Sequence, residues 1–309
     1  MDARWFGSHG IGRFACAVAT RLPDHVRLTG GPRPLSLLDP IWLSCQIRPP
    51  YAGCHWSSPI HDLTHIRLPC FSTYSQRLYY ELLVRRASNR AHRVITVSEY
   101  SRCEILKWSG LPESRVTNVG NGVESMFRPE GPLYKPGFPY ILYVGNAQPH
   151  KNLDRLFSAF ARIDDPDLRL VLTTPKTRDL MARLFKNGIE QRVHFAASVT
   201  DDDLPALYRG ALALVFPSLM EGFGLPPLEA MACGTPVVAS RSGAIPEVLG
   251  NAGLLVDPLD ASDIRQGIER VLEDRALRCG MRQAGLARAQ LFNWDTVAAK
   301  VNHVIQEAA

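Results

Sequence analysis

Residues 221–229 read Glu-Gly-Phe-Gly-Leu-Pro-Pro-Leu-Glu and hold two glutamates eight residues apart. An apolar run precedes the stretch and a helix-like one follows, so we expect Glu221 in a strand-to-helix loop and Glu229 one turn into the helix. Gly222 and Gly224 carry no side chain, which lets backbone approach a ligand closely. A helix N-terminus can bind phosphate, and carboxylates accept hydrogen bonds from hydroxyls. The stretch predicts a sugar-nucleotide site, although such loops are common in α/β proteins and glutamates are usually solvated.

Length and composition indicate an ordinary globular protein. The chain has 309 residues, 46% hydrophobic and 21% charged, which suits two domains. No apolar run approaches the ~20 residues that span a bilayer, and residues 1–5 show no signal-peptide pattern. Seven cysteines without a CxxC pair predict reduced thiols in the cytoplasm. The His and Cys residues between Cys54 and Cys70 fit no zinc template.

The positive charge lies in the first part of the chain. Residues 1–130 hold 16 Lys or Arg and 10 Asp or Glu, whereas the rest holds 19 and 20. A basic half could face an anionic membrane surface or could simply be solvated. No basic stripe with interleaved aromatics indicates nucleic acid.

Strands and helices alternate regularly in the second part, which predicts a parallel, doubly wound sheet. We expect strands at 140–144, 168–173, 193–197, 211–216, 236–240 and 253–256, and helices at 152–163, 178–187, 201–208, 261–273 and 275–292. Ligands bind at the carboxyl ends of such strands. Residues 145–151 and 218–225 both follow expected strands and are the candidate ligand loops.

The first part is less regular. We expect helices at about 10–22, 74–91 and 101–108, and strands at 93–97 and 116–119. Residues 28–60 are rich in Pro and Gly, and residues 1–4 resemble the tail of a strand. Residues 127–138, with three prolines and two glycines, predict an interdomain linker.

Eight motifs occur in the order found in glycosyltransferase family 4, whose members are retaining GT-B glycosyltransferases. They are Gly10-Ile-Gly-Arg-Phe14, His61-Asp-Leu63, Val97-Ser-Glu-Tyr-Ser101, Asn121-Gly-Val-Glu124, Val144 to Asn152, Pro217 to Val238, Ser242 to Glu247 and Gly253 to Pro258. Together they cover essentially the whole chain, which therefore resembles this family. Within it, the chain is most similar to bacterial transferases of mannose or rhamnose in O-antigen and exopolysaccharide synthesis.

The resemblance implies an α/β fold of GT-B type, with two Rossmann-like domains facing a cleft. We expect an abbreviated acceptor-side domain at 1–130 and a nucleotide-sugar domain at 131–309, with the last helix packing back on the first domain. The strand expected before His61 is short, which leaves acceptor binding and catalysis open.

The resemblance also implies the chemistry, which is transfer of a hexose from a nucleoside-diphosphate sugar, with retention. Lys151 would stabilise charge on the leaving diphosphate, Glu221 would contact donor-sugar hydroxyls, and His61 would lie beside the reacting centre. Each has a structural alternative: a surface lysine, a solvated carboxylate and a core histidine.

Further donor-binding positions are implied by the same motifs. Glu229 would hold the ribose hydroxyls, unless it only caps its helix. The other candidates are Gly10, Gly12, Arg13, Asn146, His150, Val199, Gly222, Phe223, Gly224 and Leu225. Asn146 and His150 stand where the family often has arginine, and Arg13 could supply that charge.

We expect no cofactor and no metal, since no Asp-x-Asp element is present. The expected partners are a nucleotide sugar, a saccharide or lipid-linked acceptor, and possible peripheral contact with the inner membrane face. A GT-B protein that binds nucleotide without transferring sugar is the alternative. A dinucleotide oxidoreductase is less consistent, because no Gly-x-Gly-x-x-Gly follows a strand with an acidic residue about 20 positions on.

Overall fold

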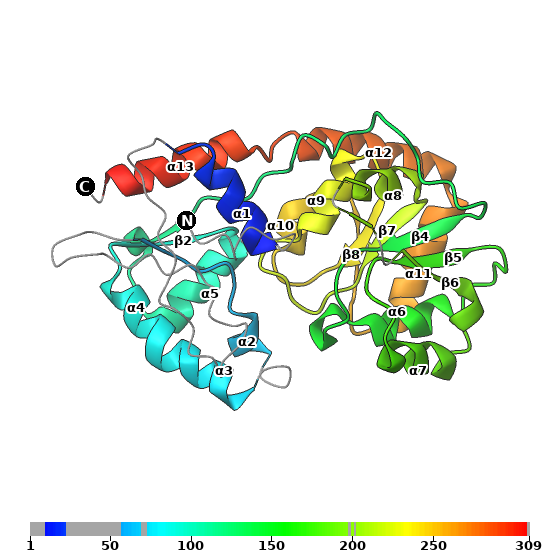
Figure 1. Cartoon of the computed structure of the whole chain (residues 1–309), viewed down its shortest axis with the longest axis horizontal. Coiled ribbons are helices and arrows are strands. Elements are labelled where there is room, and N and C mark those ends of the chain that lie inside the picture. Colours follow the sequence, from blue (N-terminus) through cyan, green and yellow to red (C-terminus); the bar gives the residue numbers. More distant parts are fainter. Residues whose placement is uncertain (1–9, 23–56, 69–72, 197–198, 201, 308–309) are drawn as a thin grey trace. The chain divides into compact units, whose positions relative to one another are not determined.

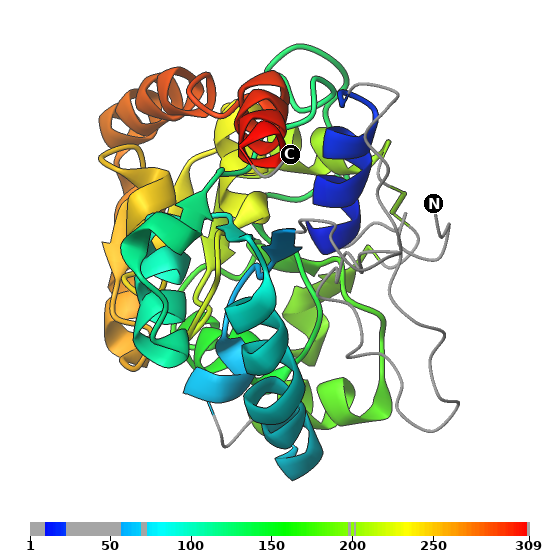
Figure 2. The same cartoon turned by 90° about the vertical axis from the view of Figure 1, so that its left-hand side faces the viewer.

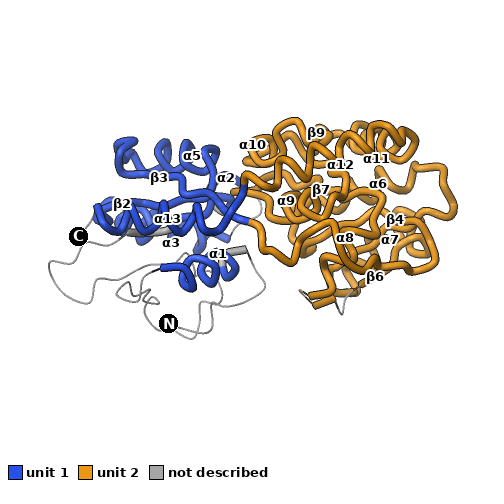
Figure 3. The backbone as a smooth tube through the Cα atoms, turned by 90° about the horizontal axis from the view of Figure 1, so that it is seen from above, with its two compact units in different colours: residues 1–122, 292–309 blue, residues 123–291 orange. Residues whose placement is uncertain are grey.

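The computed structural model describes residues 10–22, 57–68, 73–196, 199–200 and 202–307. The chain forms two compact units, residues 1–122 with 292–309 (unit 1) and residues 123–291 (unit 2) (Figure 3). The expected strand tail at 1–4, the Pro- and Gly-rich stretch up to residue 56, and the cysteines at 54 and 70 lie outside the described residues.

Unit 2 is built on a six-stranded parallel sheet with strand order β6-β5-β4-β7-β8-β9. The strands are β4 (Tyr140–Tyr143), β5 (Arg169–Leu172), β6 (Val193–Phe195), β7 (Ala213–Phe216), β8 (Val237–Ser240) and β9 (Leu254–Val256). All six expected strands are confirmed within a few residues. The order places β4 beside β7, so the loops that follow these two strands share one edge of the sheet.

Helices cover both faces of this sheet (Figure 1). On one face lie α6 (Leu153–Phe160), α7 (Arg178–Lys186) and α11 (Ala261–Glu273), and on the other α8 (Leu204–Gly210), α9 (Leu225–Ala232), α10 (Ile245–Leu249) and α12 (Arg275–Ala289). Ile141 and Tyr143 of β4 point to the first layer, where they pack with Phe157 and Ile264. The doubly wound arrangement follows from buried residues on both faces of the central strands β4, β7 and β8.

Unit 1 contains a three-stranded parallel sheet in its described part, in the order β1-β2-β3. The strands are β1 (Ser57–Pro59), β2 (Arg93–Thr96) and β3 (Val116–Asn118), with helices α1 (Gly10–Ala19), α2 (Thr64–Arg67) and α5 (Glu99–Ser109). A core of Ile60, Leu63, Val84, Ile105 and Trp108 joins the helices to the sheet. The strands expected at 93–97 and 116–119 are confirmed.

The helix expected over 74–91 is continuous but not uniform. It consists of α3 (Tyr74–Tyr79), a π-helical turn η3 (Tyr80–Val84) and α4 (Arg85–Arg90). Thr73 and Gln76 form a capping box at its start. Tyr80 and Val84 are buried against the unit 1 core, whereas the opposite side is exposed.

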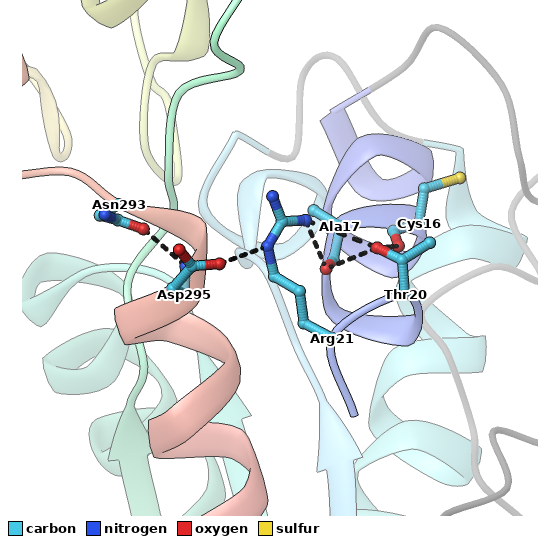
Figure 4. Close-up of polar contacts among 6 residues, drawn as sticks. All are labelled: Cys16, Ala17, Thr20, Arg21, Asn293 and Asp295. Atoms are coloured by element: carbon cyan, nitrogen blue, oxygen red, sulfur yellow. Dashed lines mark hydrogen bonds and ion pairs between the residues drawn. The ribbon is translucent and has the colours of Figure 1, made fainter. Parts of the chain in front are cut away.

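Helix α13 (Trp294–Gln306) belongs to unit 1 and packs against α1 (Figure 2). The helix expected over 275–292 instead ends at Ala289, and α13 begins anew because the Asn293 side chain caps it by accepting from Asp295 N. Arg21, just after α1, donates to Asp295 Oδ1 at 2.7 Å (Figure 4). Gly122 lies against Trp294, where a Cβ would come within 2.5 Å of the Trp294 nitrogen.

Candidate functional site

The turn after β4 is the first part of the candidate site. Gly145 has a φ of 146°, in the region that favours glycine, and lets the chain leave the strand sharply. The Tyr143 hydroxyl donates to the Asn146 carbonyl at 2.6 Å, and the Asn146 side chain accepts from Gln148 N at 3.1 Å. Burial, with a smaller effect of the Glu221 charge, raises the pKa of Tyr143, so its hydroxyl keeps its proton. Hydrogen bonds between residues of the strand end and the turn therefore fix the conformation of the turn.

Asn152 ties this turn to neighbouring loops. Its φ of 62° is left-handed, and its side-chain nitrogen donates to the carbonyls of Pro217 at 3.0 Å and Pro258 at 2.7 Å. The side chain is 4% exposed. Because Pro217 follows β7, these bonds fix the β4 turn, including Lys151, against the loop that carries Glu221.

The Glu221 loop is fixed from its other side by residues 242–244. Ala244 N donates to the Glu221 carbonyl at 3.0 Å. Gly243 has a φ of 61°, and a Cβ there would lie 2.6 Å from the Glu221 carbonyl oxygen and 2.8 Å from its nitrogen. Gly243 thus permits a backbone approach that no other residue allows.

Lys151 and Glu221 meet in an ion pair between the two loops. Lys151 Nζ donates to Glu221 Oε1 at 2.7 Å, and the side chains are 15% and 14% exposed. The ammonium also lies 5.5 Å from the centre of the Phe216 ring. A cation and a carboxylate, held by rigid loops in a partly dry place, can bind an anionic leaving group and hydroxyls respectively.

Helix α9 begins directly after this pair and carries the second glutamate. Gly224, with a φ of 108°, precedes Leu225, and a Cβ at Gly224 would lie 2.5 Å from Ile245 Cδ1. Gly222 and Phe223 complete the short loop from Glu221. Glu229 is 3% exposed and accepts from the Tyr208 hydroxyl at 2.8 Å. Pro226 and Pro227 have no N–H, so the start of this helix offers the N–H groups of Gly224 and Leu225 beside two placed carboxylates.

The nearby thiol of Cys233 has no nucleophilic character at neutral pH. Burial raises the pKa of Cys233 to about 12, with Arg209 acting in the opposite direction and Glu229 adding to the rise. A thiol with this pKa stays protonated.

Two predicted donor residues of unit 2 lie at different distances from the ion pair along the sheet. His150 immediately precedes Lys151, and its carbonyl accepts from Leu219 N at 2.8 Å, which joins the two loops again. Val199 lies after β6, the edge strand, and two strands separate β6 from β7. The structure thus gathers Asn146, His150 and Lys151 with the Glu221 loop and leaves Val199 at the sheet edge.

The remaining candidates lie in unit 1. Gly10, Gly12 and Arg13 form the first turn of α1, and the Phe14 ring packs edge-on against His61, with centroids 5.0 Å apart. His61 reaches the surface in part, but its Nε2 is buried and has no hydrogen-bond partner among the described residues. Burial lowers the pKa of His61 to about 4, against a smaller opposing effect of Asp62. His61 is a neutral imidazole at physiological pH.

Sequence patterns did not indicate three residues that organise the site. Asn152, Gly243 and Tyr208 act through backbone or side-chain contacts with residues far along the chain. Asn152 and Gly243 each lie inside one of the family motifs, but only their contacts in the structure show which loops they position. Tyr208 stands at the end of an ordinary helix pattern and carries no local signal.

Neither a metal site nor a membrane span emerges from the described part of the chain. Across residues 10–22, 57–68 and the described stretches from 73 to 307, no three His, Cys, Asp or Glu side chains gather to hold an ion. In the same residues, no helix is both long and apolar enough to cross a bilayer. Metal independence stays a prediction.

Known proteins resemble the chain in sequence and fold. The family described as glycosyl transferases group 1 matches residues 129–288. O-antigen chain mannosyltransferase B of Escherichia coli is 33% identical over 250 residues, which are 76% of this chain and 66% of that protein. MMP alpha-(1->4)-mannosyltransferase of Mycolicibacterium hassiacum is 35% identical over 72% of this chain and 56% of its own. The chain thus spans less than two thirds of either relative.

Solved structures confirm the expected fold class. Sucrose-phosphate synthase of Thermosynechococcus elongatus matches with a TM-score of 0.71 and 27% identity, over 82% of this chain and 67% of that one. The two units described above are the Rossmann-like halves of a GT-B fold.

Proposed function

The chain belongs to the glycosyl transferases group 1 family, and we propose that it transfers a hexose, with mannose favoured, from a nucleoside-diphosphate sugar. The acceptor is a saccharide or a lipid-linked saccharide of a surface polysaccharide, and the anomeric configuration is retained. The observation that carries the proposal is the Lys151–Glu221 pair, held at 2.7 Å beside the start of α9. The mannosyltransferase names of two relatives support the sugar.

Charge on the leaving group explains why these residues suit transfer. The bond between the anomeric carbon and the diphosphate breaks as the acceptor oxygen bonds to that carbon, and the leaving phosphate takes the acceptor proton. Lys151 and the backbone N–H groups of Gly224 and Leu225 stabilise the charge that grows on the phosphate, since Pro226 and Pro227 have no N–H to donate. Both are fixed before the donor arrives, so little reorganisation is needed.

The other residues hold the donor. Glu221 accepts from the sugar hydroxyls, and Glu229 accepts from the ribose hydroxyls. His61 contributes a neutral imidazole near the reacting sugar, since its buried Nε2 lacks a partner in the described residues. Arg13, in the first turn of α1, is a further residue that we propose for donor binding. The proposed reaction uses no cofactor.

A transfer assay tests the proposal. The full chain is incubated with GDP- and UDP-linked hexoses and an extract of lipid-linked saccharides, and nucleoside diphosphate release and product are measured. Glu221→Ala and Lys151→Ala should each lose most of the turnover, while Lys186→Ala, on the surface of α7, serves as the matched lysine control. Equal turnover by the site variants and the parent would contradict the assigned roles. Tight nucleotide binding without transfer to any acceptor would favour the nucleotide-binding partner protein instead.

We also propose a peripheral contact with anionic lipid at the inner membrane face. Tyr74, Leu78, Leu82 and Leu83 on helix 74–90 are 74%, 43%, 44% and 50% exposed. Three exposed arginines, at positions 85, 86 and 90, share this helix. Apolar side chains inserted at a lipid surface beside arginines near phosphate groups describe a typical interfacial helix.

Flotation with liposomes tests this contact. The parent should float with vesicles containing anionic lipid at low salt and float less at high salt. Leu78→Ser with Leu82→Ser should reduce flotation, whereas Phe185→Ser on α7, another exposed apolar residue, should not. No flotation of the parent at low salt would rule the contact out.

A further inference from the structure

A buried tyrosine contacts the glutamate that the proposed function assigns to the ribose. Tyr208 lies in α8 with no exposed surface and donates its hydroxyl to Glu229 Oε2 at 2.8 Å. Glu229 is 3% exposed, so its carboxylate is largely removed from water. A buried carboxylate needs hydrogen-bond donors to remain ionised and in one orientation.

Several contacts fix the position of Tyr208 itself. Its carbonyl accepts from the Thr235 hydroxyl at 2.6 Å, and its ring packs edge-on against Phe127, with centroids 6.0 Å apart. The phenol is therefore a rigid donor whose direction α8 sets.

We infer that Tyr208 is a positioning residue, which orients the Glu229 carboxylate so that it can accept the ribose hydroxyls of the donor. This inference rests on the proposed function. A carboxylate has about four acceptor positions on two oxygens, so it can accept hydrogen bonds from a phenol and from sugar hydroxyls at the same time. The bond to Oε2 fixes the rotation of the carboxylate plane. Without this bond, the Glu229 carboxylate could rotate about the bond that joins it to the rest of the side chain.

The consequence is a preference for ribose over deoxyribose that depends on Tyr208. Rotation of an unfixed carboxylate weakens its bonds to a sugar that offers two hydroxyls in fixed geometry. A nucleotide that lacks the 2′-hydroxyl gains little from the orientation. Removing the phenol should therefore weaken binding of the ribonucleotide more than binding of its 2′-deoxy form.

Isothermal titration of the full chain tests this with GDP and UDP and their 2′-deoxy forms. For the better-bound base, the parent should prefer the ribonucleotide by about tenfold, the worth of a hydrogen bond to a charged group. Tyr208→Phe should reduce that preference to about twofold or less, with most of the loss on the ribonucleotide. Glu229→Gln should reduce it similarly.

Tyr140→Phe is the matched control. It removes another buried phenol that donates in the same region but contacts a backbone carbonyl and not Glu229. It should lower the melting temperature while leaving the ribose preference intact. Should Tyr208→Phe fail to fold, Tyr208→His, which keeps a ring N–H donor on a shorter side chain, should show a reduced preference.

The outcomes separate this inference from the proposed function. Equal weakening of both nucleotides by Tyr208→Phe, or an unchanged preference, would overturn the positioning role while leaving nucleotide binding established. A parent chain that binds neither GDP nor UDP would overturn the proposed function, and with it this inference.

Discussion

Neutralising the two partners of the Lys151–Glu221 pair should change the binding of a nucleoside diphosphate in opposite directions. The charged atoms lie 2.7 Å apart, and both side chains are about 85% buried. At an effective dielectric constant of about 20, charges at this distance attract by about 6 kcal/mol before desolvation. After desolvation, removal of one partner of a buried pair costs about 3–5 kcal/mol of stability, and partial exposure favours the lower end.

Lys151→Met should weaken GDP or UDP binding by roughly ten- to hundredfold, since a hydrogen bond to a charged group contributes about 1.5–3 kcal/mol. Glu221→Gln should instead strengthen binding by about threefold or more, because it removes a negative charge that repels the diphosphate and competes for the ammonium. Sugar transfer should fall in both variants, because Glu221 also holds the sugar.

Isothermal titration of the full chain with GDP or UDP, at low and high salt, measures whether each substitution weakens or strengthens nucleotide binding. Arg155→Met offers a control, since Arg155 bonds Asn152 and Leu259 but not the pair. Circular dichroism confirms that each variant is folded at the titration temperature. Equal weakening by both substitutions would refute the reasoning, since it would show that the pair acts only as a structural brace. Unchanged binding by Lys151→Met would refute the phosphate role.

Three further expectations follow from individual contacts. Gly243→Ala should lower the free energy of unfolding by about 1–3 kcal/mol and raise the donor KM, because its Cβ meets the Glu221 backbone. Gly188→Ala is the control, since Gly188 has a φ of 63° but no atom near its Cβ position. In thermal melts it should show the smaller cost of the backbone conformation alone. Asn152→Gly should keep the left-handed backbone but lose two buried hydrogen bonds, at about 2–3 kcal/mol in urea unfolding followed by circular dichroism, and a melt like that of the parent would count against the anchor. The pKa of His61 is about 4 in the folded chain and 6.5 in the unfolded chain, so the free energy of unfolding of unit 1 should fall by about 2–3 kcal/mol as the pH drops from 6.5 to 4. His61→Gln should reduce this dependence of stability on pH. Tryptophan fluorescence measures it, because all 5 tryptophans lie in residues 1–122 and 292–309.

Much of unit 2 could be predicted because its signals are local. Each strand is a short apolar run bounded by turn residues, and each helix repeats its apolar face every three to four residues. The helix over 261–273 has the expected limits. The limit expected at residue 292 was wrong, since α12 ends at Ala289 and the Asn293 cap starts a new helix. A capping residue four positions beyond a helix end gives a weak signal when the apolar pattern continues.

The site was predictable where its residues are neighbours in the chain. Glu221, the two glycines and Glu229 occupy nine consecutive positions, so a strand-to-helix turn is enough to bring them together. The placement of His150 and Lys151 on a loop at a strand end also followed from the pattern. The strand order that sets β4 beside β7 did not, because parallel strands are joined by crossovers whose order local patterns leave open.

The sequence alone determined the fold class, the order of the elements and the residue types that suit a phosphate and hydroxyls. Only the tertiary structure placed Lys151 on Glu221 across 70 positions and Tyr208 on Glu229 across 21. It also revealed that the Nε2 atom of His61 is buried and that the imidazole is neutral. These properties depend on which loops and helices meet and on how much water they exclude, and neither is contained in the local pattern of any one segment.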